Sequence, residues 1–417
     1  MSEKKSKVLN LGCRLNYFES QIIQNILDTN DLKSTIVINT CAVTNQAVSK
    51  SINEIKKAKK RYPNHKLIVT GCASQIEHKK FHSLDQVNKI VDNKLKTLKN
   101  SYIFDDKGPK NQTFRFPAPP ESFKDRTRAF LQIQQGCNHR CTFCIIPFGR
   151  GDAISLPVGE ISNRLGKLIN NGYKEVTLTG VDLTSFGDDL PGKPKLGSVL
   201  KRLLKIHPKL NRLRLSSIDP AEMDKDLIDL FKYEKRVLPY LHLSIQSGDN
   251  LILKRMKRRH SREDVIEICR KLKKVRHDIK FGADIIVGFP TETNENFINT
   301  VKLTKECKFS NLHLFKFSPK NGTPASKMPQ IQNNVKNLRY KKLMNIYEKI
   351  RSEQMKDKLG KTEEILFESE KQSYTNDYFK VSLLKKKFEE KDKSKFGNIV
   401  KVKILSKRKD RLFAELV

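Results

Sequence analysis

The stretch AFLQIQQGCNHRCTFC (residues 129–144) joins a strand-like run to three closely spaced cysteines. Its first half is short and mainly apolar, which predicts a buried β-strand. Cys137, Cys141 and Cys144 then follow with the spacing C-x3-C-x2-C. In a barrel of parallel strands, the functional groups lie at the carboxyl ends of the strands. We therefore expect this cysteine loop at the functional end of an α/β barrel.

Five more strand-like runs continue this pattern along the chain, and helix-compatible stretches such as 156–172 and 261–275 separate them. The runs are EVTLTGV (175–181), RLRLSSI (212–218), YLHLSIQS (240–247), GADIIVGFP (282–290) and LHLFKFSP (312–319). Strands that alternate with helices are typical of βαβ units and a parallel sheet. The six runs cover roughly 195 residues, about three quarters of an eight-stranded barrel. The sequence predicts an open, partial (βα)6 TIM-like barrel within residues 126–355.

The first 110 residues carry a second set of strand-like runs, and each run ends in a cysteine. KVLNLGC ends at Cys13, STIVINTC at Cys41 and KLIVTGC at Cys72. Helical stretches between them predict a doubly wound parallel sheet over residues 1–110. Because parallel strands end at one edge of such a sheet, these three cysteines should meet in space. One such cysteine alone would more simply be a buried core residue.

Residues 111–125 are rich in proline and polar side chains, which predicts a linker. From residue 356 the chain changes character, with β-forming segments separated by charges and turn residues. Residues 356–417 therefore predict a small antiparallel β-barrel. Barrels of this size often bind oligonucleotides, although the fold alone does not establish that function. The fold class expected for the whole chain is α/β, with this additional all-β part.

The formal net charge of +36 points to a nucleic-acid partner, because Lys and Arg release counterions from phosphates. The excess is spread along the whole chain, so a genome that favours lysine codons is an alternative source of the charge. The sequence contains no run of about 18 apolar residues, so no transmembrane helix is expected. The first residues lack the apolar core of a signal peptide, which makes the cytoplasm the expected compartment.

Three clustered cysteines in a cytoplasmic protein favour a metal site over disulfides. A structural zinc ion needs four ligands, and His139 lies too tightly within the loop to join all three cysteines easily. A distant fourth ligand would keep zinc open as an alternative. A 4Fe–4S cluster has four iron corners, so three thiolates leave one iron free to bind a reactant. The missing fourth cysteine is therefore interpreted as an open coordination site.

The cysteine loop resembles that of the radical S-adenosylmethionine (SAM) enzymes, including the aromatic Phe143 before the last cysteine. The resemblance implies that SAM binds the open iron through its amino and carboxylate groups. It also implies that an electron from the cluster splits SAM into methionine and a 5′-deoxyadenosyl radical. The cofactors carry this chemistry, while the protein positions them and excludes water.

The chain as a whole is similar to the methylthiotransferases of that superfamily. The motifs GCRLNYFES, NTCAVTN and VTGCASQ resemble their auxiliary-cluster domain, and the loop and strand-end motifs follow in the family order. This implies a second 4Fe–4S cluster on Cys13, Cys41 and Cys72, which would hold the sulfur to be transferred. The tail resembles the RNA-binding TRAM domain. Ser74 replaces a frequent alanine of the family, which does not affect the cysteine itself.

The family has branches that act on tRNA or on a ribosomal-protein aspartate. RLSSIDP and LTGVDLTSFG most resemble the branch that modifies N6-threonylcarbamoyladenosine at position 37 of tRNA. The implied reaction replaces C2–H by C2–SCH3 and uses SAM both as radical source and as methyl donor. The isopentenyladenosine branch and the protein-modifying branch are the alternatives. A non-catalytic iron–sulfur protein that binds RNA and a two-cluster redox carrier are rivals of other classes.

The resemblance also implies partners and further site residues. We expect a monomer that binds the tRNA anticodon loop and receives electrons from a reducing flavodoxin or ferredoxin. Gly180, Gln246 and Gly288 end three barrel strands and are expected to contact SAM, and Arg258 is expected to serve SAM or substrate phosphates. For Gly180, a tight turn is an equally simple interpretation. The sequence assigns His139 and His242 structural roles and places Cys269 in a helix core, while Asp284 is interpreted as a barrel-layer residue.

Overall fold

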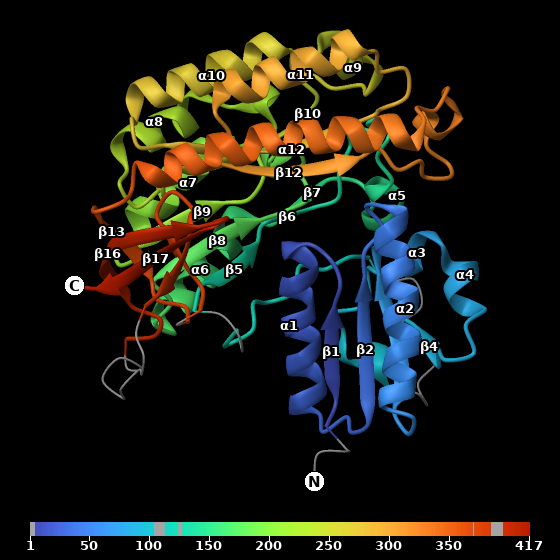
Figure 1. The fold of residues 1–417 in the computed structure, drawn as a ribbon. Coiled ribbons are helices and arrows are strands. Elements are labelled where there is room, and N and C mark those ends of the chain that lie inside the picture. Colours follow the sequence, from blue (N-terminus) through green and yellow to red (C-terminus); the bar gives the residue numbers. More distant parts are fainter. Residues whose placement is uncertain (1–4, 104–112, 124–126, 370, 385–394) are drawn as a thin grey trace.

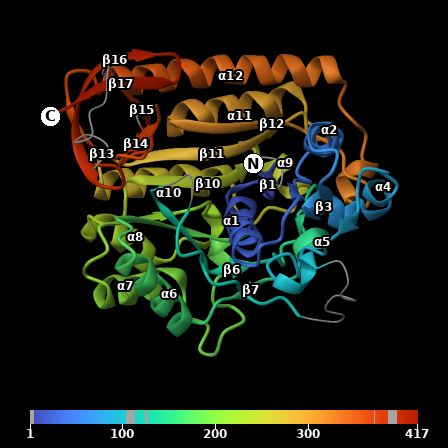
Figure 2. The same ribbon diagram turned by 90° about the horizontal axis from the view of Figure 1, so that it is seen from below.

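The computed structural model describes residues 5–103, 113–123, 127–369, 371–384 and 395–417. Three parts follow one another along the chain: an α/β sheet, a partial barrel and a small β-barrel (Figure 1). Seen from below, the first part lies against the barrel and the last part lies at the barrel's far end (Figure 2). No helix in the described part of the chain has the length and apolar character needed to span a membrane.

The first part is a four-stranded parallel sheet with the order β1-β2-β3-β4. Its strands are β1 (Lys7–Asn10), β2 (Thr35–Thr40), β3 (Lys66–Gly71) and β4 (Lys89–Ile90). Its helices are α1 (Arg14–Thr29), α2 (Asn45–Arg61), α3 (Cys72–Ile76), α4 (His78–His82) and the 3-10 turn η1 (Lys99–Tyr102). The strand order is sequential, without the reversal that marks a topological switch point.

Helices cover both faces of this sheet, as a parallel sheet requires. Ile23 and Leu27 of α1 belong to one apolar cluster with Val37 of β2. Val48 and Ile55 of α2 belong to another, with the strand residues of the opposite face. Residues of β2 are buried throughout, which explains why its sequence is a continuous apolar run rather than an alternating one.

The second part is the predicted (βα)6 barrel. Two three-stranded parallel sheets, β5-β8-β9 and β10-β11-β12, are joined by the bridges Leu213–Val237 and Ile218–Leu243. The strands are β5 (Ala129–Gln132), β8 (Glu175–Thr179), β9 (Arg212–Leu215), β10 (Tyr240–Gln246), β11 (Lys280–Val287) and β12 (Asn311–Lys316). A short hairpin of β6 (Gln134–Gln135) and β7 (Ile154–Ser155) flanks the cysteine loop.

Helices line the outside of the barrel (Figure 1). They are α6 (Val158–Asn170), α7 (Leu196–Ile206), α8 (Lys225–Tyr233), α9 (Asn250–Arg255), α10 (Arg262–Val275), α11 (Asn294–Cys307) and the long α12 (Asn333–Lys356). The short α5 (Ile146–Arg150) follows the cysteine loop, and the 3-10 turns are η2 (Leu183–Ser185), η3 (Pro220–Glu222) and η4 (Pro324–Lys327). Cys269 lies in α10 and is 5% exposed, in agreement with the predicted core role.

The third part is a closed five-stranded barrel with the order β13-β14-β15-β17-β16. Its strands are β13 (Thr362–Leu366), β14 (Ser373–Thr375), β15 (Lys380–Leu383), β16 (Ile399–Arg408) and β17 (Arg411–Leu416). The sequence predicts an antiparallel barrel, but β15 and β17 pair in parallel. An odd number of strands cannot alternate in direction around a closed ring, so one parallel pair is unavoidable.

This third part packs at the amino-terminal ends of the large barrel's strands. Arg128, just before β5, lies 2.6 Å from Glu368. Tyr240, the first residue of β10, stacks on Tyr378 with ring centroids 4.7 Å apart. The cysteine loop lies at the opposite, carboxyl end of the large barrel, so the small barrel and the cysteine loop occupy different ends.

The described part of the predicted linker, residues 113–123, has neither helix nor strand. It is nevertheless packed, because Phe123 is 3% exposed and contacts the barrel core. Arg164 of α6 also donates hydrogen bonds to the carbonyls of Phe116 and Pro117, at 3.1 and 2.6 Å. The remaining linker residues, 111–112 and 124–125, lie outside the described residues.

Candidate active site

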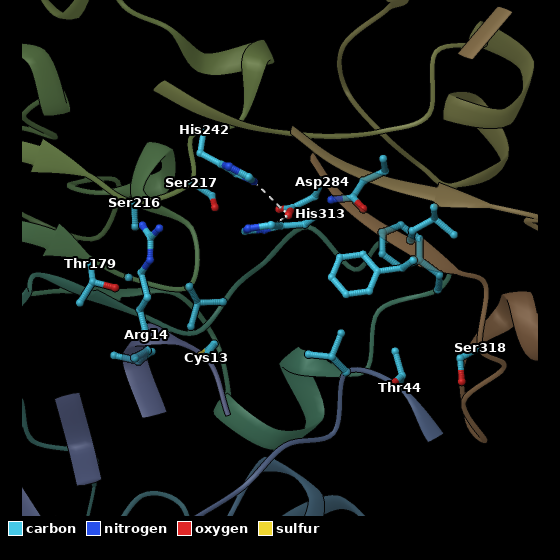
Figure 3. A pocket seen from close by; sticks show the side chains of 18 of the residues that line it. Cys13, Arg14, Thr44, Thr179, Ser216, Ser217, His242, Asp284, His313 and Ser318 are labelled. Carbon is cyan, nitrogen blue, oxygen red and sulfur yellow. Dashed lines mark hydrogen bonds and ion pairs between the residues drawn. The ribbon is translucent and has the colours of Figure 1, made fainter. Parts of the chain in front are cut away.

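A cavity of about 510 Å³ lies between the edge of the first sheet and the mouth of the barrel (Figure 3). Cys13, Arg14, Val43 and Thr44 reach it from the N-terminal sheet. The barrel contributes Thr179, Gly180, Ser216 and Gln246 at strand ends, and Asp284 and His313 from within β11 and β12. Two parts of the chain that are far apart in the sequence therefore form one site.

The loop that carries Cys137, Cys141 and Cys144 is held by backbone hydrogen bonds from three directions. Cys137 N donates to the carbonyl of Gly151, Thr142 N donates to that of Met256, and Ala325 N donates to that of Thr142. The distances are 3.1, 3.1 and 2.9 Å. Such anchoring fixes where each thiol points before any metal binds.

Gly136 opens this loop in a left-handed conformation, with φ at +71°. A side-chain Cβ at this position would lie 1.8 Å from the carbonyl oxygen of Asp152. Only glycine fits there, because both the backbone angle and the space exclude a side chain.

The second cysteine set lies at the carboxyl ends of β1, β2 and β3, where the sequence predicts it. Cys13 is the N-cap residue of α1, Cys41 follows β2 directly, and Cys72 begins α3. Cys13 is exposed, Cys41 is half-buried and Cys72 is buried. Asn93 Nδ2 lies 3.7 Å from the sulfur of Cys72.

The thiols of each set lie close enough to influence one another's charge. Burial, together with smaller contributions from the neighbouring Cys13 and Cys72, raises the pKa of Cys41 to about 11. Burial likewise raises the pKa of Cys137 to about 11 and that of Cys144 to about 12. Without metal these thiols are protonated at neutral pH, so metal binding must release their protons.

Sulfur spacing bears on whether each cysteine set suits a single zinc ion or an iron–sulfur cluster. Among the described residues, the three-residue ligand groups with all donor atoms within 4.8 Å are Cys137–His139–Asp182 and His242–Asp284–His313. Neither cysteine triad meets this spacing, whereas three thiolates on one zinc ion would lie about 3.8 Å apart. All six thiols are free. Arg258 lies near Cys144 and Arg150 lies near Cys72, and each of these cations is paired with a carboxylate, so the residues can hold 4Fe–4S clusters.

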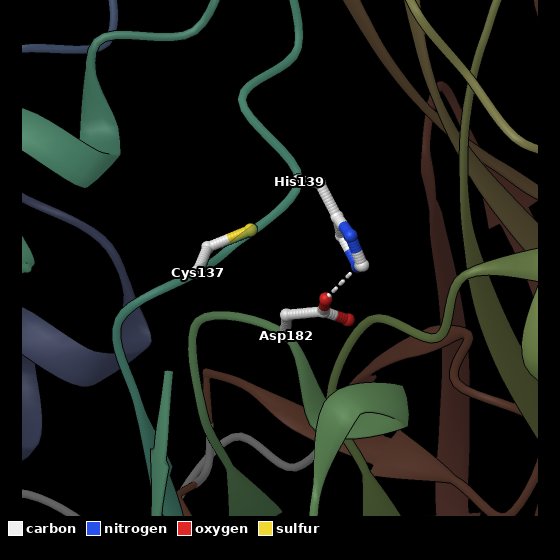
Figure 4. A group of neighbouring side chains, drawn as sticks. All are labelled: Cys137, His139 and Asp182. Carbon is white, nitrogen blue, oxygen red and sulfur yellow. Dashed lines mark ion pairs between the residues drawn. The ribbon is translucent and has the colours of Figure 1, made fainter. Parts of the chain in front are cut away.

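His139 approaches Cys137, but its ring is already engaged (Figure 4). Its Nε2 contacts a carboxylate oxygen of Asp182 and lies 3.2 Å from Ser185 Oγ. Although burial raises the pKa of Asp182, hydrogen bonds from His139, Ser185 and Thr184 hold it below its usual value overall. This agrees with the structural role that the sequence assigns to His139.

A buried ionic network joins the two cysteine sets across the domain interface. Arg150 of α5 donates to both carboxylate oxygens of Glu19 in α1, at 2.9 and 3.0 Å. Lys96 Nζ lies 2.5 Å from the same carboxylate. All three side chains are at most 2% exposed, and Arg150 and Lys96 also interact electrostatically with Cys72. No sequence motif indicates this network.

Five other predicted site residues divide into two groups. Phe143, Gly180 and Gln246 line the cavity. Arg258 and Gly288 are not among its lining residues. Arg258 Nη2 instead donates to Asp219 at 2.7 Å, while its Nη1 lies 3.6 Å from the sulfur of Cys141. Gly288 N donates to Glu292 at 2.8 Å.

Two histidines and one aspartate form the polar wall of the cavity (Figure 3). Asp284 Oδ1 lies 3.0 Å from His242 Nε2 and 3.0 Å from His313 Nδ1. The other nitrogen of His242 lies 3.1 Å from the hydroxyl of Tyr240, so the ring is fully partnered. His242 has the predicted structural role, whereas Asp284 does more than fill a barrel layer because it orients both rings.

Known proteins share both the sequence and the fold of this chain. Residues 131–304 match the radical SAM superfamily, and residues 5–92 match the uncharacterized protein family UPF0004. The chain is 12% identical to a radical SAM methyltransferase, TsrM from Kitasatospora setae. That structure matches with a TM-score of 0.55 over 77% of this chain and 73% of that chain, which shows a shared fold.

Curated relatives match over almost the whole length. Threonylcarbamoyladenosine tRNA methylthiotransferase MtaB from Rickettsia prowazekii is 44% identical over 91% of both chains. MtaB from Bacillus subtilis is 33% identical over 95% of this chain and 92% of the relative. The tRNA-2-methylthio-N(6)-dimethylallyladenosine synthase from Ehrlichia canis is 32% identical over 88% of both chains. The chain therefore belongs to the radical-SAM methylthiotransferase family, and within it to the MtaB type.

Proposed function

We propose that this enzyme converts C2–H of N6-threonylcarbamoyladenosine at position 37 of tRNA to C2–SCH3. The relative with 44% identity carries that substrate in its name, whereas relatives named for dimethylallyladenosine are 32–33% identical. The observation that carries the proposal is one cavity that lies between the two cysteine sets. Cys13 lines it from one side, and Phe143, next to Cys144, lines it from the other.

Each cysteine set would hold one 4Fe–4S cluster. Cys137, Cys141 and Cys144 would leave one iron open for SAM, and Cys13, Cys41 and Cys72 would hold the auxiliary cluster. When bound, these groups supply the radical that activates C2–H and the sulfur and methyl group that replace it. Activation by a radical suits C2–H, because that bond is strong and not acidic.

The protein's own residues position the reactants. Phe143, Gly180 and Gln246 would contact SAM at the mouth of the barrel. Arg258 would fix the Cys141 thiolate, and the Gly288 turn, tied to Glu292, would support the SAM side of the barrel. The anchored loop would hold these groups in place, and the bound reactants would exclude water from the cavity, which protects a reactive radical.

The parts of the chain would divide the work. Residues 1–110 would form the auxiliary-cluster domain, 111–125 the linker, 126–355 the radical-SAM core and 356–417 a TRAM-like RNA-binding domain. The positive charge supports binding of the tRNA anticodon loop, where bases are already partly unstacked. A reducing flavodoxin or ferredoxin would supply electrons to a monomeric enzyme in the cytoplasm.

Mass spectrometry of tRNA nucleosides from cells with and without the gene tests the substrate. Loss of the methylthio group from threonylcarbamoyladenosine, with accumulation of the parent nucleoside, is the expected result. A change confined to isopentenyladenosine would reassign the substrate to the other tRNA branch. Unchanged tRNA would direct attention to the ribosomal-protein reaction.

Two cysteine variants of the reconstituted enzyme test the division of labour between the clusters. Both Cys144→Ala and Cys72→Ala should lower iron from about eight to about four atoms per chain. Cys144→Ala should abolish SAM cleavage, whereas Cys72→Ala should still form 5′-deoxyadenosine without methylthiolating tRNA. A wild-type protein that binds RNA but never cleaves SAM would instead be a non-catalytic iron–sulfur protein.

A further inference from the structure

Arg14 is the cation of the cavity that lacks a carboxylate partner. It begins α1 next to Cys13 and lines both the main cavity and an adjoining cavity of about 250 Å³. Its Nη2 donates to the hydroxyl of Tyr378 at 2.7 Å. Within the described residues, Arg14 takes part in no ion pair with an acidic side chain. Lys316, the second cation of the main cavity, donates its Nζ to Asn337 at 2.8 Å.

The acidic groups nearby are already occupied. Asp284 is the one carboxylate among the described residues that line the main cavity, and it accepts from His242 and His313. In the smaller cavity, Arg214 is paired with Glu175 at 2.6 Å. The positive charge of Arg14 therefore faces space that no protein anion neutralises. Figure 3 shows its side chain reaching upward from the N-terminal domain into the cavity.

A second polar group of the same wall also lacks a partner. Ser216, in the RLSSIDP segment, lines the main cavity and is 7% exposed, and its hydroxyl oxygen has no hydrogen-bond partner. Buried hydroxyl groups are almost always hydrogen-bonded, so an unpaired one at a cavity wall points to a ligand. Arg14 and Ser216 together offer donors suited to an anionic group.

We infer that Arg14, assisted by Ser216, binds the carboxylate of the threonylcarbamoyl group and thereby selects this nucleoside over isopentenyladenosine. This inference rests on the proposed function and names the residue that determines its specificity. A carboxylate accepts hydrogen bonds from a guanidinium and neutralises its charge. An isopentenyl group would instead place hydrocarbon against an unpaired cation, which is unfavourable.

The geometry of adenine supports the position of Arg14 as well as its charge. C2 and C6 both flank N1 of the ring, so a substituent on N6 lies along the same edge as C2. If C2 faces the cluster that Cys13 helps to hold, the N6 substituent must lie near that cysteine. Arg14 is the next residue, and its electrostatic influence reaches His242 and Tyr240 on the barrel side.

Binding of anticodon stem-loop RNAs to the cluster-loaded enzyme tests the inference. Three RNAs are compared by fluorescence anisotropy: threonylcarbamoyladenosine, its carboxyl methyl ester and isopentenyladenosine at position 37. Arg14→Gln should weaken binding of the acid about 10- to 100-fold, because a hydrogen bond to a charged group is lost. It should leave the ester almost unchanged, and Arg14→Lys should lie between. Ser216→Ala should weaken binding of the acid about threefold to tenfold.

Controls separate this inference from the proposed function. Iron content and SAM binding must match wild type, because Arg14 neighbours a cluster ligand. Equal weakening of acid and ester by Arg14→Gln, as a phosphate contact would give, overturns the inference. A loss of discrimination in Lys316→Gln but not in Arg14→Gln also overturns it. The proposed function fails separately if wild-type enzyme methylthiolates only the isopentenyl RNA.

Discussion

The buried network of Glu19, Arg150 and Lys96 allows a sharp stability prediction. Glu19 is the single carboxylate between two buried cations, and it lies at the interface that brings the cysteine sets together. Glu19→Gln keeps the size of the side chain but removes its charge. Arg150 would retain the neutral acceptors Asn16 and Gln135, at 2.5 and 3.0 Å. Lys96 would lose the carboxylate that neutralises it.

The expected loss of unfolding free energy is about 3–5 kcal/mol, because breaking a buried ion pair leaves an uncompensated charge. The double variant Glu19→Gln/Lys96→Met should lose less unfolding free energy than the single variant, because one of the two cations left without a carboxylate is removed. Although burial raises the pKa of Glu19, attraction to Arg150 and Lys96 lowers it overall. Its stabilising charge is therefore present at neutral pH and is lost only as the pH falls below the ordinary range of a glutamate.

Hydrogen–deuterium exchange at pH 7 measures this effect within the interface. Amides of α1 should exchange more than about 100-fold faster in Glu19→Gln, while those of the C-terminal barrel should not change. In Glu19→Gln, the iron-loaded protein should lose less stability than the apo protein, because thiolates near Arg150 and Lys96 replace part of the missing negative charge. Less than about tenfold acceleration in α1 of the apo protein, or a double variant that exchanges faster than the single one, would refute this reasoning.

Three further substitutions probe other parts of the site. Gly136→Ala should displace the cysteine loop, because its Cβ has no room beside Asp152; iron analysis should show that about half the iron is lost. Arg258→Gln should leave Asp219 with weaker partners, lower stability by about 2–4 kcal/mol and slow reconstitution of the loop cluster, as followed by absorbance spectroscopy. Cys269→Ala should leave the iron content unchanged and reduce stability by about 1 kcal/mol in a denaturant titration, because this thiol packs in the core beside Cys307.

Sequence periodicity predicted where the parallel strands lie along the chain, because burial on both faces of a sheet leaves continuous apolar runs. The same logic placed Cys13, Cys41 and Cys72 together, since parallel strands end at one edge. It could not predict the parallel β15–β17 pair, which follows from closing a ring with five strands. Strand number and closure depend on tertiary packing, and no local pattern encodes them.

Single polar residues were harder to recognise than cysteine motifs. Arg14, Glu19 and Arg150 have no distinctive spacing, and each resembles a surface charge of an amphipathic helix. Their roles arise because the N-terminal sheet docks on the barrel, which buries Glu19 and turns Arg14 toward the cavity. Arg258 illustrates the reverse case: the family resemblance implies a role for it, but its contacts with Asp219 and Cys141 exist only in the folded chain.

Tyr378 connects the C-terminal barrel to substrate selection, which gives a final prediction. Its ring stacks between Tyr240 and Tyr374, with centroids 4.7 and 4.8 Å away, and its hydroxyl accepts the hydrogen bond from Arg14. Tyr378→Phe keeps the stack but frees the guanidinium, so stability should fall by only about 1 kcal/mol in a denaturant titration.

In the anisotropy assay, Tyr378→Phe should reduce the preference for the acid over the methyl ester about threefold to tenfold, because Arg14 is less well oriented. Lys316→Gln is the control that removes a cation from the cavity without touching this contact. If Tyr378→Phe discriminates as well as wild type, the hydroxyl only fills space and the C-terminal barrel has no part in selection. A reduced preference would mean that all three parts of the chain meet at one substrate group. The N-terminal sheet would supply Arg14, the large barrel would supply the cavity wall, and the C-terminal barrel would supply the Tyr378 hydroxyl that orients Arg14.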